Sequence, residues 1–309
     1  MKSAAVSASV TAAPQLPVEL WRAAGAAVMG VSHKRSGLPC QDAQGYRVLP
    51  DGVIVVALAD GAGSAAFSES GACTAVEAAL EAMIAGWVNT PTADGMCDPQ
   101  HLEQILRETF AQAREAVLQL VEREEFEAQE DAGEPPLTAR EFASTLTCAV
   151  ASPDCLAVGQ VGDGAVVALG NPDELIAVTR LQRGEYANET HFLVEEDALE
   201  QLTIDFLDRP VNGLAVMSDG LIRLALRMPS QDPHLPFFQP LFRFAQTIQD
   251  EAEASAQLAA FLDSDRVNDR TDDDKSLVLA VRVEPVTYQP PEESETSPEE
   301  QSSRNGEDE

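Results

Sequence analysis

The sequence has few basic residues and few cysteines. Lys and Arg number 20 against 52 Asp and Glu, which gives a formal net charge of -32. Most of such a surface repels a phosphate backbone, so nucleic acid is not expected as a partner. The five cysteines are an odd number and include no CxxC pair, which argues against a disulfide framework and a zinc site. A reducing cytoplasm fits this cysteine usage best.

Long apolar runs are also missing. None approaches the roughly 20 residues that span a bilayer, so no membrane association is expected. Residues 1–20 contain one Lys and a weak apolar stretch, a poor match to a signal peptide, and are predicted to form a disordered leader. Residues 284–309 are rich in Glu, Ser and Pro and predict an acidic disordered tail. One folded domain is therefore expected over residues 21–283.

The sequence does contain a repeated pattern in which an apolar run is followed by Asp-Gly. The pairs are Asp60-Gly61, Asp163-Gly164 and Asp219-Gly220, and a reversed copy puts Asp272 to Asp274 before an apolar run. A single Asp-Gly is usually an ordinary turn. Four such motifs at the ends of apolar strands predict carboxylates gathered in one cleft. Because these would repel one another, the pattern indicates a hard cation such as Mg²⁺ or Mn²⁺.

The periodicity of apolar residues predicts an α+β fold. Helices are expected over residues 67–87, from 98 to about 121, and within 241–262. Short turns separate many of the expected strands, so the pairing should be mostly antiparallel. The expected strands are residues 24–31, 46–49, 53–59, 144–151, 156–161, 166–169, 175–179, 214–217 and 277–283.

The acidic motifs, taken in order, resemble those of the metal-dependent Ser/Thr protein phosphatases of type 2C, the PPM family. The motifs are Asp42, Asp60-Gly61, Gly162-Asp163-Gly164, Ser218-Asp219-Gly220 and Asp273-Asp274-Lys275-Ser276. The stretches GVSHKRSGLPCQDA and RGEYANETHFL are similar to a bacterial branch of the family. The resemblance covers about residues 24–283 and implies an α/β/β/α sandwich, two mostly antiparallel sheets flanked by helices.

The resemblance also implies roles for individual residues. Asp60 matches the carboxylate that bridges two metal ions, and Gly61 matches a ligand through its carbonyl. Asp219 and Asp274 match the other direct ligands, and Asp42 matches the acidic residue that holds metal-bound water. Two ions, Mn²⁺ or Mg²⁺, are therefore implied. Asp163 matches a ligand of a third ion, a site left open because Arg223 stands where the family often has another Asp.

Substrate contacts are expected from two loops. His33, Lys34 and Arg35 precede Asp42, in the region where the family often places an Arg that grips substrate phosphate. Asn188 falls in the segment that corresponds to the substrate-facing flap, where a plain loop role is equally open.

The implied activity is metal-dependent hydrolysis of phosphoserine and phosphothreonine in proteins, within the pathway of a cognate Ser/Thr kinase. The alternative is a pseudophosphatase that binds a phosphoprotein or kinase without turnover. Intact Asp60, Asp219 and Asp274 favour the enzyme.

Overall fold

Two five-stranded antiparallel sheets form the centre of the protein. A computed structural model describes residues 21–49, 51–88, 98–128, 137–170, 174–180 and 190–283. The first sheet has the order β1-β12-β9-β6-β7, and the second has the order β2-β3-β4-β5-β8. The first comprises β1 (Trp21–Val28), β12 (Lys275–Arg282), β9 (Gly213–Met217), β6 (Ala165–Leu169) and β7 (Leu175–Ala177). The second comprises β2 (Ala43–Val48), β3 (Ile54–Ala59), β4 (Leu146–Ala151), β5 (Leu156–Val161) and β8 (Thr203–Leu207).

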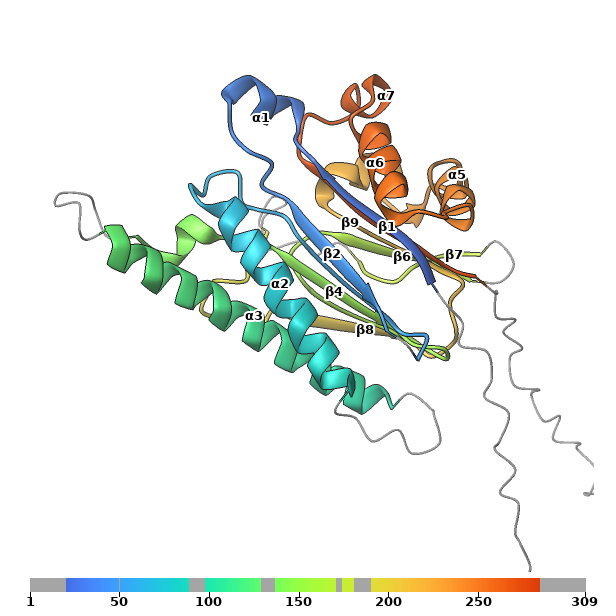
Figure 1. The fold of residues 1–309 in the computed structure, drawn as a ribbon, viewed down its shortest axis with the longest axis horizontal. Helices are drawn as coiled ribbons and strands as arrows, with labels where there is room; N and C mark the ends of the chain where they lie inside the picture. The colour runs from blue at the N-terminus through green and yellow to red at the C-terminus, as the bar shows by residue number, and fades with distance from the viewer. Residues whose placement is uncertain are drawn as a thin grey trace, which may run out of the picture.

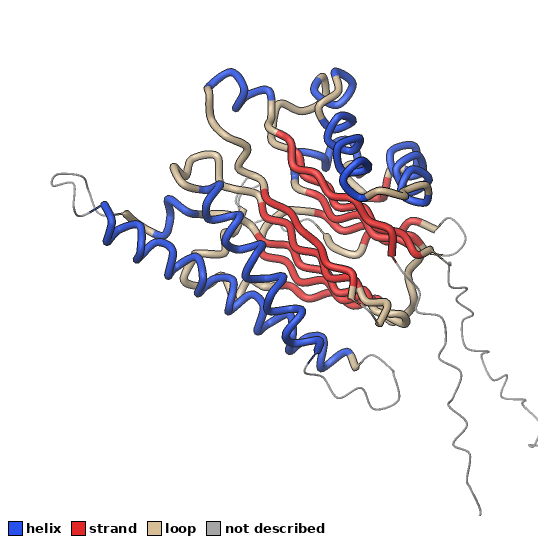
Figure 2. The backbone as a smooth tube through the Cα atoms, in the orientation of Figure 1, coloured by secondary structure: helices blue, strands red, loops and turns tan. Residues whose placement is uncertain are grey.

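Helices cover the outer face of each sheet (Figures 1 and 2). Helices α2 (Ser68–Val88) and α3 (Pro99–Ala128) pack on the second sheet, and α5 (Leu235–Gln246) and α6 (Glu251–Leu262) pack on the first. The predicted α/β/β/α sandwich is therefore confirmed. The short elements are α1 (Val31–Ser36), η1 (Ala139–Phe142), η2 (Asp219–Leu221), α4 (Ile222–Ala225), β10 (Leu226–Arg227), β11 (Asp232–Pro233) and α7 (Asp265–Asn268).

The central strands are apolar throughout because both of their faces are buried. In β3, Val55 and Ala57 belong to the core beneath α2 and α3. Ile54, Val56 and Leu58 belong to the core between the two sheets. A strand buried on both faces loses the alternation of apolar and polar residues. A third core lies beneath α5 and α6.

Helix α2 is long and apolar enough to count as a candidate membrane span by length and composition alone. The expectation that no segment reaches this length is therefore wrong for α2. The helix packs against β2, β3 and α3, and its buried residues include Ala72, Ala75 and Ala79. These contacts are those of a core helix, and small side chains let it lie close to the sheet.

Several details differ from the sequence expectations. The single helix expected within residues 241–262 is two helices, because Asp250 caps α6 by accepting a hydrogen bond from the Glu253 amide at 2.8 Å. Strand β8 was not predicted, since it is a half-exposed edge strand with Asp205 at its centre. The predicted leader and tail, residues 1–20 and 284–309, lie outside the described residues.

Cysteine chemistry departs from the expectation at one position. Cys40, Cys73 and Cys148 are free, whereas Cys155 is disulfide-bonded. The expectation of reduced cysteines is therefore wrong for Cys155. The number and spacing of cysteines in a sequence do not reveal which sulfur atoms the fold brings together. Cys97 lies outside the described residues.

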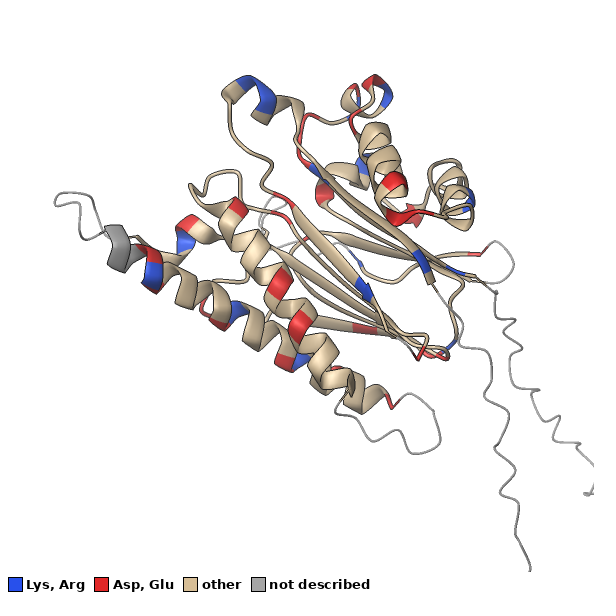
Figure 3. Cartoon of the chain, viewed as in Figure 1, with Lys and Arg blue, Asp and Glu red and all other residues tan. Residues whose placement is uncertain are grey.

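Acidic residues are spread over α2 and α3, whereas α1 is basic (Figure 3). Lys34 of α1 forms an ion pair with Asp263, which follows α6. Both side chains are more than a third exposed, so the pair adds little stability. It nevertheless links α1 to the segment that leads toward β12.

Candidate active site

The aspartate-bearing turns meet at one end of the sandwich. Asp60 follows β3, Asp163 lies in the turn from β5 to β6, and Asp219 follows β9. Because the strands are antiparallel, these ends lie together with the start of β12, which Asp273 and Asp274 precede. They border a pocket of about 200 Å³. The other residues that line it are His33, Gln41, Gly61, Ala62, Gly63, Thr145, Thr190 and Phe192.

Two glycines allow these turns to approach closely. A Cβ atom on Gly220 would lie 2.0 Å from the carbonyl oxygen of Asp274. A Cβ atom on Gly61 would lie 2.6 Å from the carbonyl oxygen of Gln41. Side chains at these positions would push the turns apart, so Gly after Asp is needed for the carboxylates to face one pocket.

Asp60 and Asp163 are each held by a threonine. The Asp60 amide donates to Thr145 Oγ1 at 3.0 Å, and the Thr145 amide donates to the Asp60 carbonyl at 2.8 Å. Thr190 Oγ1 donates to Asp163 Oδ2 at 2.7 Å. Asp60 is therefore fixed through its backbone, which leaves its carboxylate free to face the pocket.

Asp42 lies behind the pocket instead of lining it. Its side chain is 6% exposed, and neither carboxylate oxygen has a hydrogen-bond partner among the described residues. The hydroxyls of Ser218 and Ser276 lie near it without satisfying hydrogen-bond geometry. Its neighbour Gln41 is the residue at the pocket wall, and the role predicted for Asp42, holding metal-bound water, stays a prediction.

Asp273 and Asp274 have different surroundings. The Asp274 carboxylate accepts hydrogen bonds from the Gly30 amide at 2.5 Å and the Gln41 amide at 2.6 Å, and lies 3.0 Å from His33 Nδ1. Both of its oxygens are therefore used to fasten β12 to the segments around α1. Asp273 instead interacts electrostatically with Asp60 and Asp219. Asp273 Oδ1 accepts a hydrogen bond from the Asp274 amide at 2.9 Å, and both side chains line the pocket. The predicted ligand Asp274 and its neighbour Asp273 are therefore both candidates for the cation-facing carboxylate.

The clustered carboxylates have raised pKa values. Burial and the charges of Asp42 and Asp219 raise the pKa of Asp60 well above its ordinary value. Burial raises the pKa of Asp219 to about 6, although a hydrogen bond from Asp60 lowers it in part. Burial raises the pKa of Asp42 to about 7, with nearby Asp274 and Asp219 adding to the effect. Burial and the neighbouring negative charges thus favour protonation of this carboxylate cluster when no cation neutralises it.

The donors present fit a hard divalent cation. Asp219 Oδ1 and both Asp42 oxygens are buried without a hydrogen-bond partner among the described residues. Carboxylates and a backbone carbonyl are the ligands that Mg²⁺ and Mn²⁺ prefer. No three His, Cys, Asp or Glu side chains of the described part already stand in the arrangement of a complete metal site.

We expect the metal-free protein to lose stability as pH rises from about 5 to about 7. The folded-state pKa of Asp42 lies above the unfolded value of about 3.9, so the folded state binds more protons in this window and is favoured at the acidic end. Thermal unfolding in EDTA at several pH values would measure the effect. Asp42→Asn should flatten the fall, and an identical pH slope in the variant and the wild type would contradict the prediction.

The remaining predicted substrate residues are dispersed. His33 lines the pocket, whereas Arg35 is exposed on α1 and is not among the pocket-lining residues of the described part. Asn188 lies outside the described residues. Thr145, Thr190 and Phe192 also line the pocket but were not predicted from the sequence. Thr and Phe are common residue types, these three belong to no recognisable motif, and only the folded chain shows that they lie at the pocket.

Comparison with known proteins agrees with this arrangement. The family model for protein phosphatase 2C matches residues 29–263. Serine/threonine-protein phosphatase 3 of Escherichia coli is 35% identical over 271 residues, which is 85% of this chain and 99% of that protein. The chain belongs to the protein phosphatase 2C family. The predicted resemblance to Ser/Thr protein phosphatases is thereby confirmed.

Solved structures share the fold of this protein phosphatase 2C family member at low sequence identity. A bacterial serine phosphatase matches with a TM-score of 0.52 and 14% identity, over 86% of this chain and 99% of that chain. The catalytic domain of the phosphatase PstP, solved with two manganese ions, matches with a TM-score of 0.48 and 19% identity, over 86% of this chain and all of that chain.

Proposed function

We propose that the protein hydrolyses phosphoserine and phosphothreonine in proteins at a site that holds two Mn²⁺ or Mg²⁺ ions. The observation that carries this proposal is the meeting of Asp60, Asp219 and Asp273 at one pocket, with unpaired carboxylate oxygens and raised pKa values. When bound, the ions supply Lewis-acid activation of water and neutralise charge on the phosphate. The carboxylates of Asp60, Asp219 and Asp273 and the carbonyl of Gly61 would hold them.

The other residues of the pocket position the substrate and the ligands. Thr145 and Gln41 fix the backbone of Asp60 and Gly61, so these two donors keep one orientation. His33 stands at the pocket wall, where its imidazole can hold a proton near a bound phosphate. Asp163, fixed by Thr190, lies at the same wall and is available to a third ion.

No cysteine of the described part supports a covalent route. Cys40 is the nearest in sequence to the site, and its Sγ donates to the Asp42 carbonyl at 3.9 Å. Burial, together with the charges of Asp274 and Asp42, raises the pKa of this thiol to about 12. A thiol in that state is a poor nucleophile.

The substrate class is tested by phosphate release from phosphoserine and phosphothreonine peptides with and without Mn²⁺. Metal-dependent release would support the proposal. Binding of the peptides without release, at any Mn²⁺ concentration, would favour the pseudophosphatase alternative. A phosphoprotein substrate implies a Ser/Thr kinase that produces it, because the phosphoryl group removed here must first be transferred.

Two substitutions distinguish the proposed roles of Asp273 and Asp274. Asp273→Asn is expected to raise the Mn²⁺ concentration needed for half-maximal activity while leaving the melting temperature of the metal-free protein unchanged or higher. Asp274→Asn removes a charged acceptor from the Gly30 and Gln41 amides and should cost roughly 1–3 kcal/mol of metal-free stability.

Mn²⁺ titrations followed by activity and by thermal unfolding measure both effects. Asp272→Asn is the matched control, because it removes the same charge from the same turn while its exposed side chain stays outside the pocket. If Asp274→Asn weakened Mn²⁺ binding and left the stability of the metal-free protein unchanged, Asp274 would be the metal ligand and the proposed roles would be wrong.

A further inference from the structure

A second pocket lies behind the turns that carry Asp219 and Asp273. Its volume is about 400 Å³, within the roughly 300–1,000 Å³ that is usual for small-molecule sites. The pocket lies between α4, the first half of α5, the end of α6 and α7. It shares no lining residue with the active-site pocket, so it is a separate site.

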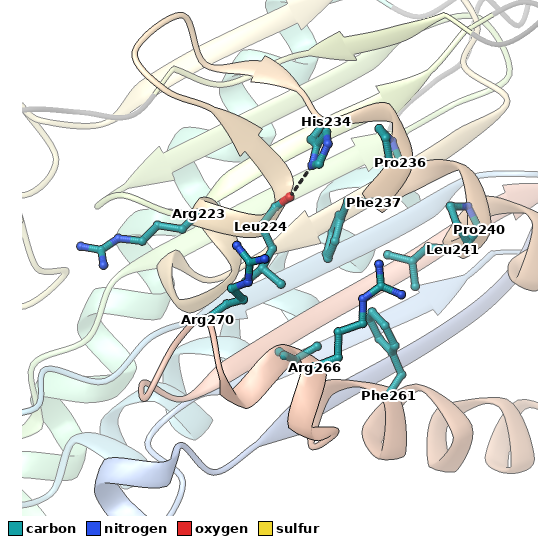
Figure 4. Close-up of a pocket in the computed structure, with 11 residues that line it drawn as sticks. Arg223, Leu224, His234, Pro236, Phe237, Pro240, Leu241, Phe261, Arg266 and Arg270 are labelled. Atoms are coloured by element: carbon teal, nitrogen blue, oxygen red, sulfur yellow. Dashed lines mark hydrogen bonds between the residues drawn. The ribbon is translucent and has the colours of Figure 1, made fainter.

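The floor of this pocket is apolar. Phe237, Leu241 and Phe261 lie side by side beneath it, and Leu224 closes one side (Figure 4). The ring of His234 is held in place, with Nδ1 3.2 Å from the Leu224 carbonyl oxygen. Phe237 and Phe261 are in contact, with ring centroids 6.4 Å apart. The floor is therefore a fixed aromatic surface, suited to a flat or extended apolar group.

The rim of the pocket is basic. Arg266 and Arg270 direct their guanidinium groups over the apolar side chains, whereas Arg223 extends to one side (Figure 4). None of the three forms an ion pair with a carboxylate in the described part of the chain. Such unpaired arginines are unexpected in a protein with 52 acidic and 20 basic residues.

We propose that this pocket binds a small organic anion with an apolar body, namely an aromatic or aliphatic carboxylate. The apolar body lies against Phe237 and Phe261, and the carboxylate accepts hydrogen bonds from Arg266 and Arg270. Guanidinium groups bind carboxylates through charge-assisted, often paired hydrogen bonds. The repulsion that the acidic surface exerts on anions elsewhere makes this rim the favoured place for such a ligand.

The pocket is connected to the ligand-bearing turns through short stretches of chain. Arg223 follows Asp219 by four residues, and Arg270 precedes Asp273 by three. A ligand that draws these arginines inward therefore acts on segments contiguous with the active site.

Isothermal titration of the full-length protein with 2-naphthoate, in the presence of Mn²⁺, tests the proposal. Saturable binding is expected. The double variant Arg266→Gln and Arg270→Gln should bind at least about 10-fold more weakly, because hydrogen bonds to charged groups contribute about 1.5–3 kcal/mol. Arg243→Gln is the matched control, since it removes a positive charge from an exposed position of α5 that does not line the pocket.

Two further probes separate the charge from the apolar body. The neutral 2-naphthamide and the small anion acetate should each bind at least about 10-fold more weakly than 2-naphthoate, since each lacks one of the two interactions. Equal affinity of 2-naphthoate for the double variant and the wild type would overturn the proposal. So would loss of binding in Asp60→Asn with no loss in the arginine variant, because the anion would then occupy the active site.

Discussion

Asp60→Asn is expected to abolish Mn²⁺-dependent phosphate release, lowering kcat/KM by at least about 1,000-fold, since metal ions contribute several kcal/mol to such reactions. The charges of Asp42, Asp219 and Asp273 all act on the Asp60 carboxylate. An amide at this position removes the charge that would hold an ion against the other two ligands. Its backbone hydrogen bonds with Thr145 do not involve the side chain, so the turn should keep its shape.

Metal-free stability distinguishes this loss of activity from unfolding. In Asp60→Asn the repulsion within the cluster falls, so the melting temperature in EDTA should equal or exceed that of the wild type. The stabilisation by saturating Mn²⁺, about 2.7 kcal/mol at 100 times the dissociation constant, should be largely lost. Asp272→Asn again serves as the control for a lost charge. Near-wild-type turnover by Asp60→Asn would refute the assignment of the site.

The sandwich could be predicted from the sequence because its central strands have a strong local signal. The apolar runs that form β3, β5, β9 and β12 are buried on both faces, and each begins or ends at an Asp-containing turn. Edge strand β8 carries no such signal, since its side chains are half-exposed and its position depends on pairing with β5.

The site could be predicted only to the level of its turns. The run of aspartates before β12 shows that a carboxylate enters the cluster, but adjacent residues point in different directions from one another. The Gly30 and Gln41 amides donate hydrogen bonds to the Asp274 carboxylate, and both residues come from a distant part of the chain. The orientation of the side chains in this turn therefore depends on contacts that the local sequence does not show. The pairing of Asp163 with Thr190 is hidden for the same reason.

His33 is the candidate for the general acid of the reaction. Many family members have His after the first Asp-Gly pair, whereas here Ala62 lines the pocket at that position. The His33 side chain is 12% exposed, and its Nδ1 lies 3.0 Å from Asp274 Oδ2. When both ring nitrogens carry protons, Nδ1 donates to Asp274 and Nε2 is left to donate to the leaving oxygen. The side chain of Ala62 cannot donate a proton, whereas the fold places the imidazole of His33, from α1, at the same pocket.

His33→Ala is expected to slow hydrolysis of phosphoserine peptides by about 100-fold or more, within the range of about 10²–10⁴ that general acid catalysis contributes. Aryl phosphates with acidic phenols should be affected much less, because such groups leave without protonation. A plot of log kcat/KM against leaving-group pKa should therefore be steeper for His33→Ala than for the wild type. Adding Ala62→His to His33→Ala should restore part of the loss, because it places an imidazole at the same pocket.

The control is His101→Ala, which removes an imidazole from α3 at a position that does not line the pocket. A steeper slope in His33→Ala alone identifies His33 as the proton donor. If the slopes of the wild type and His33→Ala coincide while both are flattened by Ala62→His, the site works without a side-chain acid. In that case His33 serves only to position Asp274, and its removal should lower stability without changing leaving-group dependence.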